Sequence, residues 1–152
     1  MRMIGVRQLG ASDLAGFRAL NALFAEVFAD PESYAAKPPG DAWLQRLLAR
    51  DDFVALVAED DGAVVGGLAA YVLEKFEQER SEIYIYDLAV AEANRRRGIA
   101  TALIRFLQQV AAARGAWVIY VQADHGDDPA IALYTGLGAR EDVLHFDIPV
   151  KS

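Results

Sequence analysis

The sequence predicts a mixed α/β fold, with helices covering a central sheet, in a single domain over residues 1–152. Strand-type and helix-type runs alternate along the 152 residues, a length that suits one domain. Two of the strand runs flank Asp61-Gly62, which is the signal of an antiparallel hairpin. A strand, a helix and a strand over 82–122 form a right-handed crossover unit, so those two strands are expected to be parallel.

The N-terminal half predicts a strand, two helices and the hairpin. The first strand is "MIGVRQL" (3–9), and Ser12 or Asp13 can cap a helix whose apolar residues recur at helical spacing: Phe17, Leu20, Phe24 and Val27. Three prolines in "ADPESYAAKPPG" end that pattern, and a short helix follows over 43–48. The hairpin is "DFVALVAEDDGAVVGGLAAYVL".

The C-terminal half predicts three more strands and two helices. "SEIYIYDLAV" is a strand, "ATALIRFLQQVAAARG" is a helix that ends at Gly115, and "AWVIYVQA" is the next strand. "DPAIALYTGLG" is a short helix with Pro129 in its first turn, and "DVLHFDI" is a last strand. No internal repeat is visible.

Composition excludes several classes of protein. Hydrophobic residues make up 54% and charged residues 24% of the chain, which is typical of a globular protein. No apolar run approaches the roughly 20 residues that span a bilayer, and the N-terminus lacks a signal-peptide core, so the cytoplasm is the expected location and no membrane partner is expected. Zero cysteines and only two histidines, His125 and His145, predict no metal site. A net charge of -7 argues against nucleic acid and allows a cationic partner.

The segment "DLAVAEANRRRGIATALI" (87–104) joins a strand to a helix through three arginines and a glycine. A helix N-terminus presents unpaired N–H groups and the positive end of its dipole, so such a turn can hold phosphate. Gly98 and Ala100 keep side chains out of the way. A solvated basic turn on the surface is the alternative. Neither a P-loop nor a dinucleotide-binding glycine pattern is present.

The pattern R-x-x-G-x-A, formed by Arg95, Gly98 and Ala100 after "LAV", resembles the acetyl-coenzyme A signature of the GNAT superfamily of N-acetyltransferases. "DDPAIALYTGLG" resembles the superfamily's N-x-x-A-x-x-L-Y-x-x-L-G, with Asp127 for the usual Asn. "GGLAAYVLEKFEQERSEIYIYDLAV", "VIYVQADHGDDPAIALYTGLG" and "HFDI" resemble the aminoglycoside 3-N-acetyltransferases of GNAT type. The resemblance implies a GNAT-like mixed sheet with an antiparallel N-terminal meander, a splayed parallel strand pair and flanking helices. The sequence departs from the superfamily's patterns at three further places. Gly136 stands where a lysine is common, Ala139 stands where an aromatic residue often follows the glycine, and no proline follows "LAV".

The resemblance also implies where acetyl-coenzyme A, the cosubstrate, is held. Backbone groups of Leu88, Ala89 and Val90 are expected to pair with the pantetheine arm. The pyrophosphate is expected at the following turn: Arg95, Arg96, Gly98, Ile99, Ala100 and Thr101. In the later motif, Asp127, Ala130 and Tyr134 are expected at the cofactor, with Tyr134 as the acid that protonates the departing thiolate. A tyrosine that only packs its helix on the sheet is the alternative.

The residues that bind the amine substrate and take its proton are harder to identify from the sequence than those that hold the cofactor. Strict alternation puts Glu82, Tyr84, Tyr86 and Leu88 on one face of their strand, and Ser81, Ile83, Ile85, Asp87 and Ala89 on the other. Tyr84 aligns with a catalytic glutamate of some relatives, so we expect Tyr84 to contact substrate and the base to be Glu82, through water, or Asp124 of the acidic loop. Asp124, Asp127 and Asp147 are expected to bind a polycationic acceptor. Alternatively, Asp127 or Asp128 caps a helix, and His125 shuttles protons or is exposed.

The hypothesis is therefore an acetyl-coenzyme A dependent aminoglycoside 3-N-acetyltransferase that confers antibiotic resistance, with direct attack of the amine in a ternary complex. One alternative is a GNAT enzyme acting on a polyamine, a protein lysine or an N-terminal amine. Another is a cofactor-binding domain without turnover. A homodimer is compatible with the superfamily, although no stretch of the sequence shows an interface.

Overall fold

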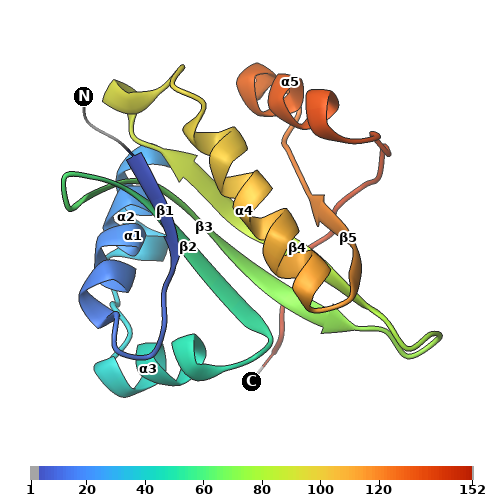
Figure 1. Cartoon of the computed structure of the whole chain (residues 1–152), viewed down its shortest axis with the longest axis horizontal. Helices are drawn as coiled ribbons and strands as arrows, with labels where there is room; N and C mark the ends of the chain where they lie inside the picture. Colours follow the sequence, from blue (N-terminus) through green and yellow to red (C-terminus); the bar gives the residue numbers. More distant parts are fainter. Residues whose placement is uncertain (1–3, 152) are drawn as a thin grey trace. The chain divides into compact units, whose positions relative to one another are not determined.

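A computed structural model describes residues 4–151 (Figure 1). The chain divides into two compact units, and the boundary between them along the chain falls between Gln122 and Ala123. The first unit contains, in order, β1 (Ile4–Gln8), α1 (Leu14–Val27), α2 (Pro31–Tyr34), α3 (Asp41–Ala49), β2 (Phe53–Asp60), β3 (Ala63–Glu74), β4 (Ser81–Val90), the 3₁₀ turn η1 (Glu92–Asn94), α4 (Ile99–Ala113) and β5 (Ala116–Val121). The second unit contains α5 (Asp128–Leu137).

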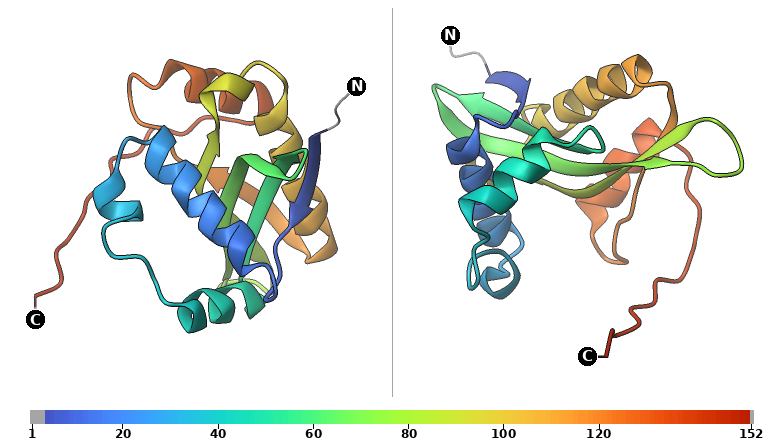
Figure 2. Two further views of the ribbon diagram at one scale, coloured as in Figure 1. Left: turned by 90° about the vertical axis from the view of Figure 1, so that its left-hand side faces the viewer. Right: turned by 90° about the horizontal axis from the view of Figure 1, so that it is seen from below.

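The first unit is built on a five-stranded sheet in the order β1-β2-β3-β4-β5. The first three neighbouring pairs are antiparallel and the β4–β5 pair is parallel, which confirms the mixed sheet expected from the sequence. The β2–β3 hairpin turns at Asp61 and Gly62, with φ of 53° and 83°, the positive pair that a tight two-residue hairpin turn requires. Helices α1 and α3 cover one face of the sheet and α4 covers the other (Figure 2).

The core lies between α1, α3 and the sheet. The helical stripe of Phe17, Leu20 and Phe24 is buried, as its spacing predicts. Helix α1 comes so close to the sheet at Gly67 that an added Cβ would lie 2.6 Å from the Leu56 carbonyl oxygen and would overlap the Leu20 side chain. On the opposite face, α4 buries Ile99, Leu103, Ile104, Leu107 and Ala111.

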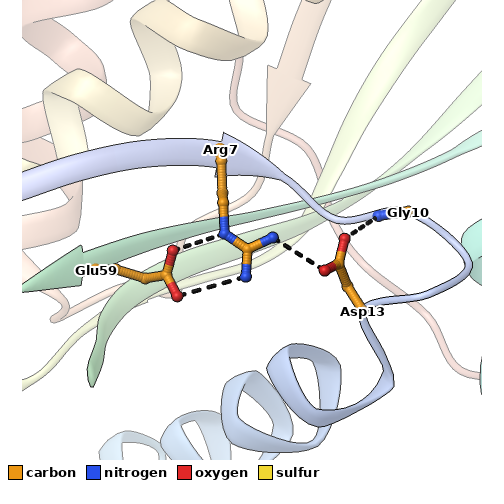
Figure 3. A network of polar contacts seen from close by, with 4 residues as sticks. All are labelled: Arg7, Gly10, Asp13 and Glu59. Atoms are coloured by element: carbon orange, nitrogen blue, oxygen red, sulfur yellow. Dashed lines mark hydrogen bonds and ion pairs between the residues drawn. The ribbon is translucent and has the colours of Figure 1, made fainter. Parts of the chain in front are cut away.

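The β1–α1 junction is held by one guanidinium (Figure 3). Arg7 Nε donates to Glu59 Oε1 at 2.6 Å, and Arg7 Nη1 lies 3.1 Å from Asp13 Oδ1. The other Asp13 oxygen accepts from the Gly10 N–H at 2.8 Å. The Gly10 hydrogen bond, and after it Arg7, hold the pKa of Asp13 below its usual range. Asp13 occupies the N-cap position, but these contacts engage its carboxylate, so it does not cap α1 as the sequence suggested.

One expectation about secondary structure is wrong, and one short helix was not expected. The predicted last strand "DVLHFDI" does not form, because no neighbouring strand pairs with it among the described residues, and its large apolar side chains are exposed. A strand pattern without a partner leaves the backbone N–H and C=O groups to water. Conversely, the proline-rich stretch contains α2, which begins at Pro31 and is capped by Asp30, whose carboxylate accepts from Ser33 N–H at 3.1 Å.

Within residues 4–151, none of the helices combines the length and apolar character that crossing a bilayer requires.

Candidate active site

The turn from β4 into α4 leaves a helix N-terminus open. Gly98 is the N-cap residue, with a left-handed φ of 74°, and no side chain caps the helix there. The N–H groups of Ile99, Ala100 and Thr101 have no intrahelical acceptor, as in the first turn of any α-helix. No acidic side chain lies in this first turn. The partial positive charge of the helix end is therefore free to bind an anion.

The three arginines before Gly98 differ in whether they form an ion pair. Arg97 Nη1 lies 3.8 Å from Asp60 Oδ2, so this guanidinium belongs to an ion pair with β2. Arg95 and Arg96 are exposed, and no residue of the described range 4–151 forms an ion pair with either of them. These two charges beside the α4 N-terminus fit a pyrophosphate.

The parallel strands β4 and β5 pair over only part of β4. Their register extends from Ser81 to Ile85 on β4, whereas β4 continues to Val90. On its other side, β4 stays paired with β3 through Val90. The β5-facing backbone groups of Leu88–Val90 thus have no sheet partner in the described sheet, and an extended ligand can add there as a strand. The free edge and the open helix end follow each other along the chain, in the order that fits the pantetheine arm and pyrophosphate of coenzyme A.

A bulge changes which β4 side chains face α1 and α3. Asp87 pairs with Ala69 and Ile85 pairs with Ala70, so Tyr86 is an extra residue without a partner on β3. Tyr86 and Asp87 consequently line the same pocket. Strict alternation placed them on opposite faces, and that expectation is wrong because the bulge interrupts the period of two.

This pocket has a volume of about 190 Å³ and lies between α1, α3 and strands β2 to β4. Its walls are largely aromatic, and include Phe17, Trp43, Phe53, Tyr71 and Tyr86. The ring centroids of Phe53 and Tyr71 are 5.2 Å apart, and those of Tyr71 and Tyr86 are 6.0 Å apart. Asp87 is the one charged residue among the described residues that line it.

The Asp87 carboxylate is half-buried and is held by Tyr34 of α2. Tyr34 Oη donates to Asp87 Oδ2 at 2.7 Å. Burial raises the pKa of Asp87, and the Tyr34 hydrogen bond partly offsets that rise. Burial and the Asp87 carboxylate raise the pKa of Tyr34 well above its ordinary value, so Tyr34 stays a donor. The Tyr34 ring packs against Phe24 and Phe28, which fixes its direction.

Glu82, a predicted base, lies at the other end of β4. It accepts from Trp117 Nε1 at 3.2 Å and lies 3.6 Å from Lys75 Nζ. Six residues of strand separate Glu82 from Leu88, which corresponds to roughly 20 Å. The role of Glu82 as a base stays a prediction. One water that bridged Glu82 to an amine beside Leu88 could not span that distance. Tyr84, the predicted substrate contact, stacks on Tyr120 with centroids 4.7 Å apart and donates to Gln122 Oε1 at 2.9 Å.

The remaining predicted residues belong to the second unit. Asp127 caps α5, because its carboxylate accepts from the Ala130 N–H at 3.4 Å, as the alternative interpretation of this residue foresaw. The Asp127 N–H donates to the Asp124 carbonyl at 3.2 Å, so these two residues share one tight turn. Burial, and after it the charge of Asp127, raise the pKa of Tyr134. Asp147 is exposed in the extended C-terminal segment, with Oδ1 2.8 Å from His145 Nε2.

The sequence did not identify Asp87, Tyr34 and their pocket as a site. One signal was present, since strict alternation put a carboxylate, Asp87, on the same face as Ile83 and Ile85. A carboxylate among buried apolar side chains needs a hydrogen-bond or ion-pair partner, or a function that explains its cost. No signal points to Tyr34, because the proline-rich stretch that contains it predicts a break between helices.

No group of three or more His, Asp and Glu side chains within 4–151 is arranged to hold a metal ion.

Comparison with known proteins places this geometry in a family. The family model "Acetyltransferase (GNAT) family" matches residues 17–139. The crystal structure of an aminoglycoside acetyltransferase from an uncultured soil metagenomic sample is similar, with 59% sequence identity and a TM-score of 0.96 over 98% of this chain and 99% of that chain. A second aminoglycoside acetyltransferase from an uncultured soil metagenomic sample, solved in complex with sisomicin, is 35% identical, with a TM-score of 0.91 over 97% of each chain.

Among curated proteins, N-acetyltransferase family 8 member 2 of Rattus norvegicus is 32% identical over 90 residues. That match covers 59% of this chain and only 40% of the rat protein, so the chain spans less than half of that relative. The GNAT family match, by contrast, extends over most of this chain and includes both the open α4 N-terminus and α5. The chain belongs to the acetyltransferase (GNAT) family.

Proposed function

We propose that this protein is an acetyl-coenzyme A dependent aminoglycoside 3-N-acetyltransferase that confers antibiotic resistance. The observation that carries the proposal is the free β5-facing edge of Leu88–Val90, which residues 91–98 connect to the open N-terminus of α4. Together they offer hydrogen-bond partners for a pantetheine arm and an anion site for a pyrophosphate. Acetyl-coenzyme A would supply the acetyl group as a thioester. The two aminoglycoside acetyltransferase structures support the acceptor class.

Direct attack of the amine is the simplest chemistry for this chain, because it has no cysteine to carry the acetyl group. In the proposal, Tyr134 protonates the departing thiolate. A tyrosine is protonated at neutral pH, as a proton donor requires, and burial raises the pKa of Tyr134 further above its ordinary value. Asp124, Asp127, Asp147 and Tyr84 are proposed to contact the acceptor. Glu82 and Asp124 remain the bases proposed from the sequence, with the geometry of Glu82 counting against it.

A polyamine is the second candidate acceptor. The pocket at Asp87 has one carboxylate and aromatic walls, and such a site accepts a single alkylammonium as readily as an aminoglycoside amine. A protein lysine or an N-terminal amine satisfies the same chemistry. In each case the protein is an acetyl-coenzyme A dependent N-acetyltransferase, and the alternatives differ only in the acceptor.

Product analysis separates these candidates. The protein is incubated with acetyl-coenzyme A and, separately, gentamicin, kanamycin, spermidine and a lysine peptide, and each product is examined by NMR. Acetylation of the 3-amino group of gentamicin is the expected result. Acetylation of another ring amine would retain the enzyme class and overturn the 3-N assignment, and acetylation of spermidine alone would favour the polyamine alternative.

Three further points belong to this proposal. Residues 1–152 act as one catalytic domain, a view supported by a family match that runs past Gln122 to residue 139. The protein works in the cytoplasm, where acetyl-coenzyme A is available. It forms a homodimer through the extended C-terminal segment, where Leu144, Phe146 and Ile148 alternate as exposed apolar side chains.

The dimer proposal has a specific register. If two copies of the segment pair antiparallel about Phe146, then Leu144 of one copy lies opposite Ile148 of the other, and His145 lies opposite Asp147. The apolar side chains then share one face, and on the other face His145 of each copy can hydrogen-bond to the Asp147 carboxylate of the other. If Phe146 and its copy form a hydrogen-bonded pair, Pro149, which has no N–H, falls at a position that does not donate within this pair.

A further inference from the structure

We propose that the first unit carries a second binding site, which takes the carboxylate group of a small monocarboxylate or amino acid. The site is a cleft between the β3–β4 loop and the end of α4, where Arg80 and Ser81 form the floor and Arg114 lies at the rim. This proposal does not rest on the proposed acetyltransferase function, because it concerns residues that have no part in it.

The cleft lies at the end of β4 that is remote from the proposed cofactor site. It has a volume of about 360 Å³, and its walls come from the last residues of β3, from the loop 75–80, from the start of β4 and from the residues that follow α4. Seven residues of strand separate Ser81 from Leu88, which corresponds to roughly 23 Å. A ligand in the cleft therefore leaves the place proposed for the pantetheine arm unoccupied.

Arg80 supplies a guanidinium that lacks an acceptor. Its central carbon lies 4.1 Å from the centroid of the Trp117 ring, so the group is held by a cation–π contact. Its Nε is buried without a hydrogen-bond partner in the described part of the chain, and none of the described carboxylates forms an ion pair with the guanidinium. A buried donor without an acceptor is costly, and a carboxylate is the acceptor that the planar guanidinium fits best.

Ser81 supplies a second donor beside Arg80. It is only 8% exposed, and its hydroxyl forms no hydrogen bond with any residue between 4 and 151. A buried hydroxyl without a partner has the same kind of cost as the Arg80 Nε. Two neighbouring donors at the floor of one cleft, both without acceptors, indicate a ligand that brings acceptor oxygens.

The other charged residues of the cleft limit the charge of the ligand. Lys75 is engaged, since its Nζ lies 3.7 Å from Glu77 Oε1 and 3.6 Å from Glu82 Oε1. Glu74 and Glu79 are exposed at the rim, where water and salt weaken their repulsion of an anion but do not remove it.

The negative end of the α4 dipole acts in the same sense as the two rim glutamates, because the cleft adjoins the C-terminus of that helix. Arg114 opposes this effect with a guanidinium that none of the described side chains pairs with. The balance favours one carboxylate over a multiply charged phosphate, and an ammonium beside that carboxylate would lie near the rim glutamates. A small monocarboxylate or an amino acid is therefore the expected class.

Trp117 reports on the cleft through its contact with Arg80. The chain has two tryptophans, so Trp43→Phe leaves Trp117 as the only indole. In this variant, sodium acetate and glycine are titrated at constant pH, with sodium chloride keeping the ionic strength constant. We expect a saturable change in Trp117 fluorescence with a Kd of about 1–10 mM, the affinity of roughly one charge-assisted pair. A signal that does not saturate by about 200 mM for either ligand would overturn the proposal.

Amide NMR shifts of the full chain locate the site and measure affinity in variants. Acetate and glycine are expected to shift the Ser81 and Gly115 amides, whereas shifts confined to the N-terminus of α4 would overturn the proposal. Arg80→Gln is expected to raise the Kd at least about tenfold. Arg105→Gln is the control, because it removes an exposed arginine of the same helix that bonds to Gln108 outside the cleft. Equal Kd values in Arg80→Gln and Arg105→Gln would contradict the site.

Ser81→Ala keeps the Arg80–Trp117 contact and removes only the hydroxyl. We expect its Kd for glycine to rise about threefold to tenfold, the loss of one hydrogen bond to a charged group. An unchanged Kd would exclude Ser81 from the site, and inorganic phosphate binding as tightly as glycine would overturn the assignment to a carboxylate. These titrations contain no acetyl-coenzyme A, so their outcome stands apart from that of the acetylation assay.

Discussion

Gly67 lies where α1 approaches β3 most closely, and its missing side chain is required there. In Gly67→Ala, the added Cβ would lie 2.6 Å from the Leu56 carbonyl oxygen, a backbone atom of β2 that cannot move without breaking the sheet. We expect a loss of about 2–3 kcal/mol in the free energy of unfolding, measured by urea denaturation. Gly5→Ala is the matched control in β1, because no atom lies within 4 Å of a Cβ there. A Gly67→Ala variant as stable as Gly5→Ala would contradict the close packing of α1.

Replacement of Arg95 tests the proposed anion site at the N-terminus of α4. It is extended, with φ of -67°, so alanine is compatible with the backbone. Arg95→Ala is expected to raise the KM for acetyl-coenzyme A about tenfold with little change in kcat, because it removes binding that is present before and during the reaction. The difference from wild type should shrink at high salt. Arg105→Ala, which removes an exposed arginine hydrogen-bonded to Gln108, is the control. Equal KM values for the two variants would exclude Arg95 from the site.

At the residue scale, the sequence identified what depends on local backbone chemistry and missed what depends on the tertiary fold. Gly98 and the arginines were found because a glycine turn before a helix is recognisable from adjacent letters. Asp87 was assigned to the wrong face because alternation assumes an unbroken strand, and the bulge at Tyr86 changes the register only through pairing with β3. The Tyr34 contact with Asp87 joins residues 53 positions apart.

Among the elements, the β1–α1 junction gives a pH-dependent prediction. Asp13 has a lowered pKa, so its contribution to stability is present above the unfolded value of about 3.9 and is lost as the pH falls through the folded value. Arg7→Met removes the Arg7 share of this effect. We expect a loss of less than about 1 kcal/mol near neutral pH, since the pair is partly exposed. The difference should shrink below about pH 4.

Urea denaturation of wild type and Arg7→Met between neutral and acidic pH measures this difference. Arg105→Met serves as the control, because Arg105 bonds to the neutral Gln108 and its replacement should show no such pH dependence. A wild-type minus Arg7→Met difference that grows as the pH falls would contradict the assigned role of Asp13.

Element boundaries were predicted well where a strand or helix carries its own signals. The hairpin at Asp61-Gly62, strand β4 and helix α4 lie where the sequence pattern placed them, within a residue or two. The last predicted strand failed because alternation describes one chain segment, whereas a strand also needs a neighbour. Helix α2 was missed because its single turn is too short for a helical period to appear.

On the scale of the whole molecule, the unpaired C-terminal segment predicts self-association. Phe146→Asp is expected to shift the protein from dimer to monomer, since it places a charge on the apolar face, and light scattering after size exclusion would measure the mass. Because the chain has no cysteine, Phe146→Cys offers a sharper test of the register. Residue 146 meets its own copy in the proposed pairing, so mild oxidation should give a disulfide dimer, whereas Leu144→Cys alone should not. A wild-type protein that stays monomeric at high concentration would overturn the dimer.

The net charge of -7 suits a cationic acceptor, but the sequence could not say which carboxylates bind it, because acidic residues are spread along the chain. The mixed sheet was predictable as a whole, since its hairpin and its crossover unit are both local in sequence. The pocket at Asp87 was not, because it is assembled from α1, α3 and three strands.

Release of free coenzyme A thiol from acetyl-coenzyme A in the presence of gentamicin is the measurement to make first. We expect thiol release that requires both substrates and saturates with gentamicin. The absence of thiol release with every aminoglycoside tested, in protein shown to bind acetyl-coenzyme A, would contradict the proposed aminoglycoside acetyltransferase function.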